Sequence, residues 1–294
     1  MKGAPTDRRV LRSNGEVAHL SLRGRVEARR FAESARHSVA VPVTPIIGKA
    51  SPFGPREREL AFGEAFEVLD IQGGLAFGWA ARDGYVGYVA AEALSERSFR
   101  PTHRVISPSY WMSEPRLKCG YDPERLPIGA LVKVFTTHRD HCDWAEVDLP
   151  PTDPDMKGGA VYVPMPTLAP LGGASDLVAE AERYLGVPYL WGGNSGWGID
   201  CSGLVQAACL ACGIACPGDS DQQAAKLGEA LAEDADLRRG DLIFWKGHVA
   251  LVVGDGRILH ANARDMMVAY EDMAAALARI EAAEGPVTVR RRVV

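Results

Sequence analysis

The stretch Tyr189-Leu-Trp-Gly-Gly-Asn-Ser-Gly-Trp-Gly-Ile-Asp-Cys-Ser-Gly203 decides the fold of the C-terminal part of this chain. Its glycines allow the backbone to come close to a neighbouring group. Asp200 is suited to cap a helix, because its carboxylate can accept hydrogen bonds from the unpaired N–H groups of the first turn. Cys201 then lies in that turn, where the N–H groups and the helix dipole favour a thiolate, while nearby carboxylates oppose it. A thiol nucleophile at this position requires a base from elsewhere in the chain.

Two histidines further along the chain can supply that base. His248 opens one expected strand and His260 ends the next, with the hairpin signal Gly254-Asp-Gly256 between them. The two can therefore lie near each other on adjacent strands, although a shift of one residue would turn one of them away. A Cys–His pair with a third polar group that orients the imidazole is a general arrangement for a thiol nucleophile. A second imidazole can be that third group. Each of these residues alone is more often a packing residue, but the three in this order form a more specific pattern.

The C-terminal part has expected helices first and expected strands afterwards, which indicates an α+β domain. The first helix starts at Ser175 or Asp176 and runs to Leu185. A short helix starts at Asp219 or Ser220, where Ser220-x-x-Gln223 fits a capping box. The other expected helices are 200–212 and 272–284, and the expected strands are 241–245, 248–253, 257–261 and 287–292.

Residues 38–170 have a different pattern, of short apolar runs separated by Gly, Pro and Asp, which indicates small all-β units. An internal repeat is present: Gly63, Trp79 and Tyr88 recur in order as Gly129, Trp144 and Tyr162. The two glycines are 66 residues apart, a length that suits one small barrel. Residues 1–37 are rich in arginine, and we expect them to form an arm that packs on the first unit.

The composition of the whole chain sets limits on its partners. The chain has 294 residues, of which 47% are hydrophobic and 24% charged, with a formal net charge of -5. The length corresponds to two domains, or three small ones, and the acidic balance argues against binding to a nucleic-acid backbone. No run approaches the roughly 18 apolar residues of a membrane span. The N-terminus shows no secretory signal, so a cytoplasmic location is expected.

The six cysteines are too sparse for a disulfide scaffold, and free thiols are expected. Cys209, Cys212 and Cys216 are close together, as metal ligands would be. However, Cys209 and Cys212 fall on an apolar stripe with helical spacing, and no second close pair of Cys or His supplies the remaining ligand. No metal and no organic cofactor are therefore expected.

Four segments carry a resemblance to the NlpC-type cysteine peptidases of cell-wall metabolism, which have a papain-like fold. They are Asp200-Cys-Ser-Gly203, Arg239-Gly-Asp-Leu-Ile-Phe-Trp245, Gly247-His-Val-Ala250 and His260-Ala-Asn262. The resemblance covers about residues 172–294 and implies that Cys201 is the nucleophile, His248 the general base and acid, and His260 the orienting residue. It also implies that the backbone N–H of Cys201 contributes to the oxyanion hole.

The stretch Asp83-Gly-Tyr-Val-Gly-Tyr-Val89 resembles bacterial SH3-like domains. The expected architecture is an arm at 1–37, SH3-like barrels at 38–98 and 99–171, and an α+β papain-like peptidase domain at 172–294. Two SH3-like barrels before such a domain resemble the γ-D-glutamyl–diamino-acid endopeptidases, including dipeptidyl-peptidase VI. That likeness implies a murein-derived peptide with a free N-terminal L-Ala as substrate, and a first barrel that helps to close the site.

A free ammonium group requires acidic and hydroxyl partners. Asp200 is one candidate. Glu64 is another, because the second copy of the repeat has Ala130 at that position, although a solvated surface glutamate is equally consistent. Tyr85 and Tyr88 are candidate hydroxyl partners, of which one belongs to the core. The resemblance adds further expected substrate contacts: Tyr189, Trp191, Ser202, Asp219 and Ser220. Asp219 and Ser220 can also cap the short helix that starts there.

The expected function is hydrolysis of the γ-D-Glu–diamino-acid bond in short murein peptides. The thiolate attacks the D-Glu carbonyl, the diamino-acid part leaves, and water releases L-Ala-D-Glu. No nucleic acid, membrane or obligate protein partner is expected. Two alternatives stay open at this point: a related thiol amidase or acyltransferase, and a non-catalytic module that binds wall peptides. The third residue of the peptide, diaminopimelate or lysine, also stays open.

Overall fold

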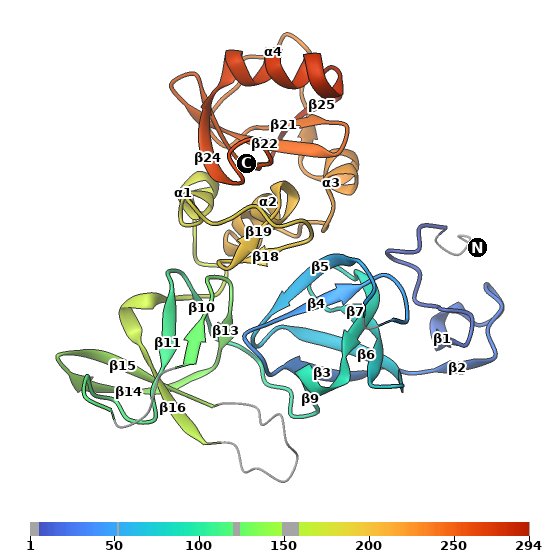
Figure 1. Cartoon of the computed structure of the whole chain (residues 1–294), viewed down its shortest axis with the longest axis vertical. Coiled ribbons are helices and arrows are strands. Elements are labelled where there is room, and N and C mark those ends of the chain that lie inside the picture. The colour runs from blue at the N-terminus through green and yellow to red at the C-terminus, as the bar shows by residue number, and fades with distance from the viewer. Residues whose placement is uncertain (1–5, 52, 120–123, 149–158, 294) are drawn as a thin grey trace. The chain divides into compact units, whose positions relative to one another are not determined.

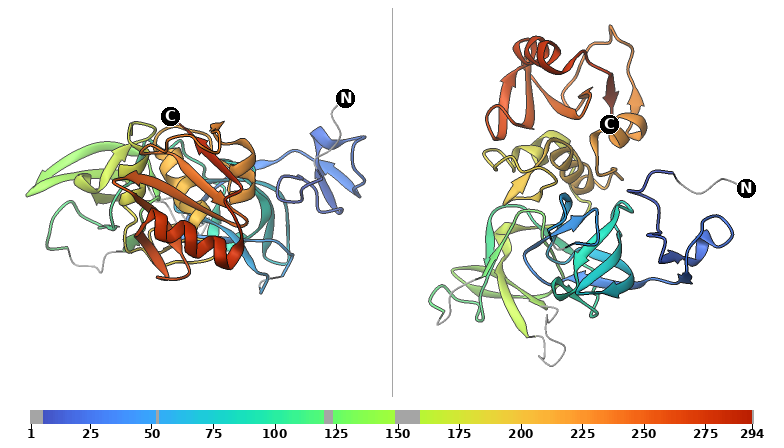
Figure 2. Two further views of the ribbon diagram at one scale, coloured as in Figure 1. Left: turned by 90° about the horizontal axis from the view of Figure 1, so that it is seen from above. Right: turned by 45° about the vertical axis from the view of Figure 1, so that its right-hand side comes forward.

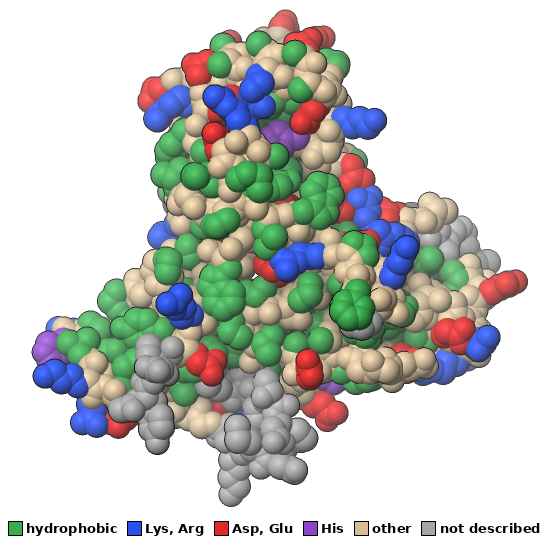
Figure 3. All heavy atoms as spheres, viewed as in Figure 1, with side chains coloured by type: hydrophobic (Ala, Val, Ile, Leu, Met, Phe, Trp, Pro, Cys, Tyr) green, Lys and Arg blue, Asp and Glu red, His purple; other side chains and the backbone are tan. Residues whose placement is uncertain are grey.

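The computed structural model describes residues 6–51, 53–119, 124–148 and 159–293, and the chain forms two compact units, Met1–Ala169 and Pro170–Val294 (Figure 1). Acidic and basic side chains are interspersed on the face shown in Figure 3, as the small net charge leads one to expect. Among the residues described, no helix has the length and apolar character needed to cross a membrane.

The first unit contains a seven-stranded antiparallel sheet in the order β5-β4-β8-β7-β6-β3-β9, which curls around its own core (Figure 1). Side chains that alternate along the strands meet inside, and Val39, Ile46, Leu60 and Phe66 are fully buried there. The strands are β3 (Ala35–Val39), β4 (Val43–Ile47), β5 (Arg56–Ala61), β6 (Ala65–Gln72), β7 (Leu75–Ala80), β8 (Val86–Ala90) and β9 (Leu94–Ser95).

The arginine-rich arm packs on β7 and β8. Its strands β1 (Val17–His19) and β2 (Arg30–Ala32) pair in parallel, and a 3-10 turn, η1 (Leu20–Leu22), lies between them. Val17 is buried against Phe77 and Trp79, and the guanidinium of Arg12 lies 4.3 Å from the centroid of the Trp79 ring. The arm therefore supplies part of a small second core on the outer face of the barrel.

The remaining β elements of the first unit repeat the order of the barrel. The strands β6-β7-β8 form a meander with Trp79 on the middle strand, and β14-β15-β16 form a second meander with Trp144 in the same place. A 3-10 turn and a short strand follow in both copies: η2 (Ala91–Ala93) with β9, and η3 (Met165–Thr167) with β17. The strands are β10 (His103–Val105), β11 (Ser109–Trp111), β12 (Glu124–Leu126), β13 (Leu131–Val132), β14 (Val134–Asp140), β15 (Cys142–Asp148), β16 (Ala160–Pro164) and β17 (Leu168–Pro170).

The second unit is α+β. A six-stranded antiparallel sheet in the order β20-β25-β21-β22-β23-β24 lies between α2 and α4 (Figures 1 and 2). The strands are β20 (Glu229–Ala230), β21 (Leu242–Trp245), β22 (His248–Gly254), β23 (Arg257–Asn262), β24 (Met267–Asp272) and β25 (Val289–Arg292). The helices are α1 (Leu177–Glu182), α2 (Cys201–Ala211), α3 (Ser220–Lys226) and α4 (Met273–Glu284), and a small hairpin joins β18 (Asn194–Ser195) to β19 (Gly198–Ile199).

The hairpin of β22 and β23 forms where its turn signal predicts it. Gly254 pairs with Arg257, and the two residues between them, Asp255 and Gly256, have φ values of 49° and 67°. This is the left-handed conformation at both central positions that a tight two-residue turn requires. Three of its strand residues, Ala250, Val252 and Ile258, share a buried cluster with Ile243 of β21 and with Ala276 and Ile280 of α4.

Two details of the expected helices are wrong. Helix α1 ends at Glu182 rather than Leu185, because the next N–H groups bond three residues back: Tyr184 to Ala181 at 3.0 Å and Leu185 to Glu182 at 3.1 Å. At α3 no capping box forms, because the Gln223 amide donates to the carbonyls of Ser202 and Pro217, both at 2.9 Å. The strand β24 was not expected at all.

Replacing Phe244 with alanine tests the core of the second unit. Phe244 is fully buried on β21, so Phe244→Ala should lower the free energy of unfolding by about 3–5 kcal/mol through lost burial and a cavity. Phe135→Ala is the matched control, since that ring is 54% exposed, and its effect should stay within about 0.5 kcal/mol. Chemical denaturation of both variants measures this, and equal losses would contradict the assigned core.

Candidate active site

Asp200 holds the start of α2 and the loop before it in one arrangement. Its Oδ1 accepts hydrogen bonds from the backbone N–H of Gly203 at 2.6 Å and from the Ser202 hydroxyl at 3.0 Å. Its Oδ2 accepts from the backbone N–H of Gly192 at 2.9 Å. The carboxylate is buried and acts as the expected N-cap, and it also ties the glycine-rich stretch to the helix.

The glycines of this stretch are required by close backbone contacts. A Cβ atom on Gly193 would lie 2.4 Å from the carbonyl oxygen of Gly198, and one on Gly203 would lie 2.5 Å from that of Gly193. Neither of these neighbours is a movable side chain. The group that the backbone approaches is therefore the first turn of α2 itself, together with the β18–β19 hairpin.

Cys201 is the first residue of α2 and is buried. Its Sγ lies 4.0 Å from the carbonyl oxygen of Gly247, the residue before His248. The thiol of α2 thus lies next to the backbone of the residue that precedes His248, although Cys201 and His248 are 47 positions apart in the sequence.

The two histidines contact each other directly. His248 Nε2 lies 2.9 Å from His260 Nδ1. Leu251 pairs with Leu259, and continuing this register places His260 opposite residue 250, which is one alternation from His248 on the same face. The structure therefore brings His248 and His260 into contact, and it places the Cys201 thiol next to Gly247.

A fourth polar residue, Glu271 of β24, lies next to the Cys–His–His row, which consists of Cys201, His248 and His260. Its Oε2 lies 3.2 Å from His260 Nε2, a charge contact whose geometry is poor for a hydrogen bond. Sequence reasoning missed Glu271 because it missed β24. The short run Val268-Ala269-Tyr270 before Glu271 was the available signal, and it is weak because it is short and does not alternate.

Burial controls the charge of both imidazoles. Burial, followed by the neighbouring His260 and Arg279, lowers the pKa of His248 to about 3. Burial also lowers the pKa of His260, with Glu271 acting in the opposite direction. Both rings are therefore neutral near pH 7, so His248 is able to accept a proton.

The other expected site residues of the second unit have different environments. Tyr189 is partly buried, and burial together with the charges of Cys201 and Asp200 raises the pKa of its phenol, which keeps the hydroxyl as a donor beside the thiol. The Trp191 ring is 68% exposed. Ser202 is buried with its hydroxyl on Asp200, and Asp219 is the N-cap residue of α3, which begins at Ser220.

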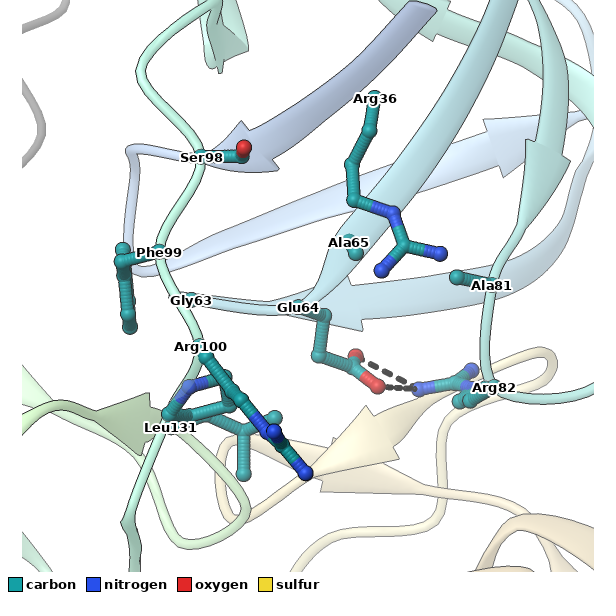
Figure 4. A pocket seen from close by; sticks show the side chains of 11 residues that line it. Arg36, Gly63, Glu64, Ala65, Ala81, Arg82, Ser98, Phe99, Arg100 and Leu131 are labelled. Carbon is teal, nitrogen blue, oxygen red and sulfur yellow. Dashed lines mark hydrogen bonds and ion pairs between the residues drawn. The ribbon is translucent and has the colours of Figure 1, made fainter. Parts of the chain in front are cut away.

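Glu64 is not the solvated surface residue that one interpretation expected. It is only 9% exposed, and Arg82 Nη1 donates to its two oxygens at 2.7 and 2.6 Å. Figure 4 shows this pair in a cavity of about 720 Å³ that Arg36 and Arg100 also line. Tyr85 belongs to the barrel core, whereas the partly buried Tyr88 accepts a hydrogen bond from Asn14 at 3.2 Å.

No disulfide bond joins any two of the six cysteines, all of which the structure describes, and Cys209 and Cys216 are buried. Within the described ranges, no group of three or more His, Cys, Asp or Glu side chains is placed to hold a metal ion.

The fold and the Cys–His–His row define a papain-like α+β domain of the thiol-hydrolase class. Residues 186–280 match the NlpC/P60 family, and residues 49–94 match the bacterial dipeptidyl-peptidase SH3 domain. The chain therefore carries an NlpC/P60 domain preceded by an SH3 domain of the bacterial dipeptidyl-peptidase type.

Curated relatives and a solved structure agree with this assignment. Gamma-D-glutamyl-L-lysine dipeptidyl-peptidase of Bacillus subtilis (strain 168) is 43% identical over 98 residues, which are 31% of this chain and 32% of that protein. The probable endopeptidase p60 of Listeria welshimeri is 35% identical over 102 residues, 33% of this chain and 19% of that protein. The crystal structure of an NlpC/P60 family protein from Bacillus cereus ATCC 10987 shares the fold, with a TM-score of 0.71 at 20% identity, over 88% of this chain and 99% of that chain.

Protonation of His248 should make stability depend on pH. The unfolded chain takes up this proton near pH 6.5, but the folded chain does so only near pH 3, so stability falls as pH falls through that window. His248→Asn should flatten the fall in unfolding free energy between pH 7 and pH 4. His141→Asn, at a side chain that is 71% exposed, is the control. Equal slopes in the wild type and His248→Asn would contradict the burial of a neutral ring.

Gly193→Ala tests the close contact of the loop with the helix. The added methyl group would meet the Gly198 carbonyl and push the loop from the first turn of α2, so we expect a loss of about 1–3 kcal/mol in stability and slower alkylation of Cys201. Gly173→Ala is the control, because its nearest neighbour would be 3.8 Å away. Alkylation followed by peptide mapping reports on the thiol, and an unchanged rate would show that the loop yields without cost.

Proposed function

We propose that this protein is a cysteine peptidase that hydrolyses the bond between γ-linked D-Glu and a diamino acid in short murein peptides with a free N-terminal L-Ala. The observation that carries the proposal is the row in which Cys201 Sγ lies 4.0 Å from the carbonyl of Gly247 and His248 Nε2 lies 2.9 Å from His260 Nδ1. This row occurs in an NlpC/P60 domain that follows an SH3 domain of the dipeptidyl-peptidase type.

The reaction follows from the positions of these groups. His248 takes the thiol proton, and Sγ attacks the D-Glu side-chain carbonyl. The backbone N–H of Cys201, in the first turn of α2, donates to the oxyanion. His248 then returns the proton to the leaving amine of the diamino acid. Water, deprotonated by the same imidazole, hydrolyses the thioester and releases L-Ala-D-Glu and the free thiol.

The substrate class is supported by two comparisons. The Bacillus relative is named for a γ-D-glutamyl-L-lysine bond and for release of a dipeptide. The SH3 domain of this chain is of the type described for bacterial dipeptidyl-peptidases. These points favour a γ-D-glutamyl bond, while the third residue, lysine or diaminopimelate, is decided by the experiment below.

The proposal includes recognition of the free ammonium group. Asp200 is the candidate carboxylate of the second unit, and Glu64 with the Tyr88 hydroxyl are the candidates of the first. Both carboxylates already accept hydrogen bonds from the chain. An ammonium ion at either carboxylate would therefore compete with these hydrogen bonds, and at Glu64 it would compete with Arg82. Selection for a free N-terminus suits peptides already released from the wall, and a role in recycling and a cytoplasmic location form part of this proposal.

We also propose that residues 99–171 form a second SH3-like barrel. The repeated meander and the shared fold over 88% of the chain support this. Phe62 and Val105 pack in the same cluster as Ala145 and Val163, so this segment shares a core with the end of β5.

Mass spectrometry of the protein with L-Ala-γ-D-Glu-diaminopimelate, its lysine counterpart and their N-acetylated forms tests the function. We expect cleavage of the free peptides only, and a loss of about a thousandfold or more in Cys201→Ala. Cys212→Ala, at the opposite end of α2, is the matched control and should cleave normally.

Each of the other outcomes would reject a different part of the proposal. Equal cleavage of free and acetylated peptides would keep the peptidase and reject recognition of the ammonium group. Cleavage of none of them would reject the peptidase and favour an amidase or a peptide-binding module.

A further inference from the structure

We propose that Glu271 is a positioning residue of the active site, which sets the tautomer of His260 and, through it, the basic nitrogen of His248. The inference rests on the proposed function only in assuming that the Cys201–His248 pair reacts. It assigns a role to a residue outside the Cys–His–His row.

Glu271 is placed rigidly. It pairs with Ile258 across β23 and β24, which puts it on the face that carries His260. It is 8% exposed, and its Oε2 lies 3.2 Å from His260 Nε2. Arg264 Nη1 donates to Oε1 at 2.8 Å, and Arg279 of α4 donates to Oε1 at 3.0 Å and to Oε2 at 2.7 Å.

The two arginines keep the carboxyl group ionised despite its burial. The hydrogen bond and the charge of Arg279 hold the pKa of Glu271 below its usual range. An ionised carboxylate can only accept hydrogen bonds. A bare Nε2 of His260 would place its lone pair against this negative charge, 3.2 Å away, so the charge contact favours Nε2 as the nitrogen that carries that ring's single proton.

The tautomer of His260 determines that of His248. With its proton on Nε2, His260 presents the lone pair of Nδ1 to His248 Nε2, 2.9 Å away. His248 must then carry its proton on Nε2, which leaves Nδ1 as the nitrogen that can accept the proton of Cys201. One buried carboxylate thus selects the protonation state of both imidazoles.

The role is one of orientation rather than of supplying charge. At His248 the charge of Glu271 raises the pKa, but the charge of Arg279 lowers it. The two effects oppose each other, so the ion pair adds little net charge at the base. What remains is the orienting effect of the negative charge on the His260 tautomer, and through it on the direction of the hydrogen bond between the two imidazoles.

Glu271→Gln tests this directly. If the glutamine oxygen keeps the arginine hydrogen bonds, its NH₂ group faces His260 Nε2 and favours the opposite tautomer. We expect the ¹⁵N signals of His260 to change from the Nε2–H form to the Nδ1–H form or a mixture. Alkylation of Cys201 at pH 7 should slow by roughly tenfold to a hundredfold, by analogy with the loss of a partner that orients a metal-bound histidine. In peptide cleavage, kcat should fall with little change in KM.

Two variants make the test specific. Glu182→Gln is the matched control, because Glu182 accepts a hydrogen bond at 2.8 Å from Tyr270, the neighbour of Glu271, and it should behave as wild type. In the background of His260→Asn, Glu271→Gln should have no further effect on alkylation, since the carboxylate acts through His260.

Glu271→Asp distinguishes the loss of the carboxylate acceptor from a purely structural effect of the substitution. It keeps an acceptor-only group, so a folded Glu271→Asp protein should retain the Nε2–H tautomer and more of the alkylation rate than Glu271→Gln. A wild-type tautomer and rate in Glu271→Gln, or an equal loss in Glu271→Asp, would overturn the proposal. The ¹⁵N and alkylation measurements need no peptide, so a protein that cleaves none of the peptides but shows the tautomer change would reject the proposed substrate and keep the role of Glu271.

Discussion

The carboxylate of Asp200 is the constraint on which the site depends. It accepts hydrogen bonds from the first turn of α2 and from Gly192 of the preceding loop, so the helix start and the loop cannot move separately. The glycines at 193 and 203 permit this contact, because any side chain there would meet a carbonyl oxygen. As a result the Cys201 thiol is held at a helix N-terminus and next to the Gly247 carbonyl.

Burial keeps the imidazoles of His248 and His260 neutral, and it also makes any charge beside them unfavourable. Neutral rings avoid the penalty of a buried charge, and this is why the pKa values of His248 and His260 are lowered. A buried glutamate beside them would be unfavourable on its own, but two arginines that reach it from the surface compensate its charge. The site thus contains two neutral imidazoles that can take up and release a proton. Beside them lies an ion pair, Glu271 with its arginines, that keeps its charges.

Patterns within a few residues predicted much of the second unit. Asp176 and Asp200 cap the helices where expected, and the Asp255-Gly256 turn places β22 against β23. The errors arise where a distant partner competes with a local one. Gln223 fits a local capping box, but its amide is needed by the carbonyls of Ser202 and Pro217, which no local pattern reveals.

The sequence by itself determined the helix that bears Cys201, the hairpin that bears both histidines and the repeat Gly63–Tyr88 and Gly129–Tyr162, because each depends on turn, cap or periodic signals between near neighbours. Only the tertiary structure decided that Glu64 is buried on Arg82, that Tyr85 rather than Tyr88 is a core residue, and that Glu271 contacts His260. These contacts join side chains from different strands. They depend on strand register and on burial, which near neighbours in the sequence do not determine.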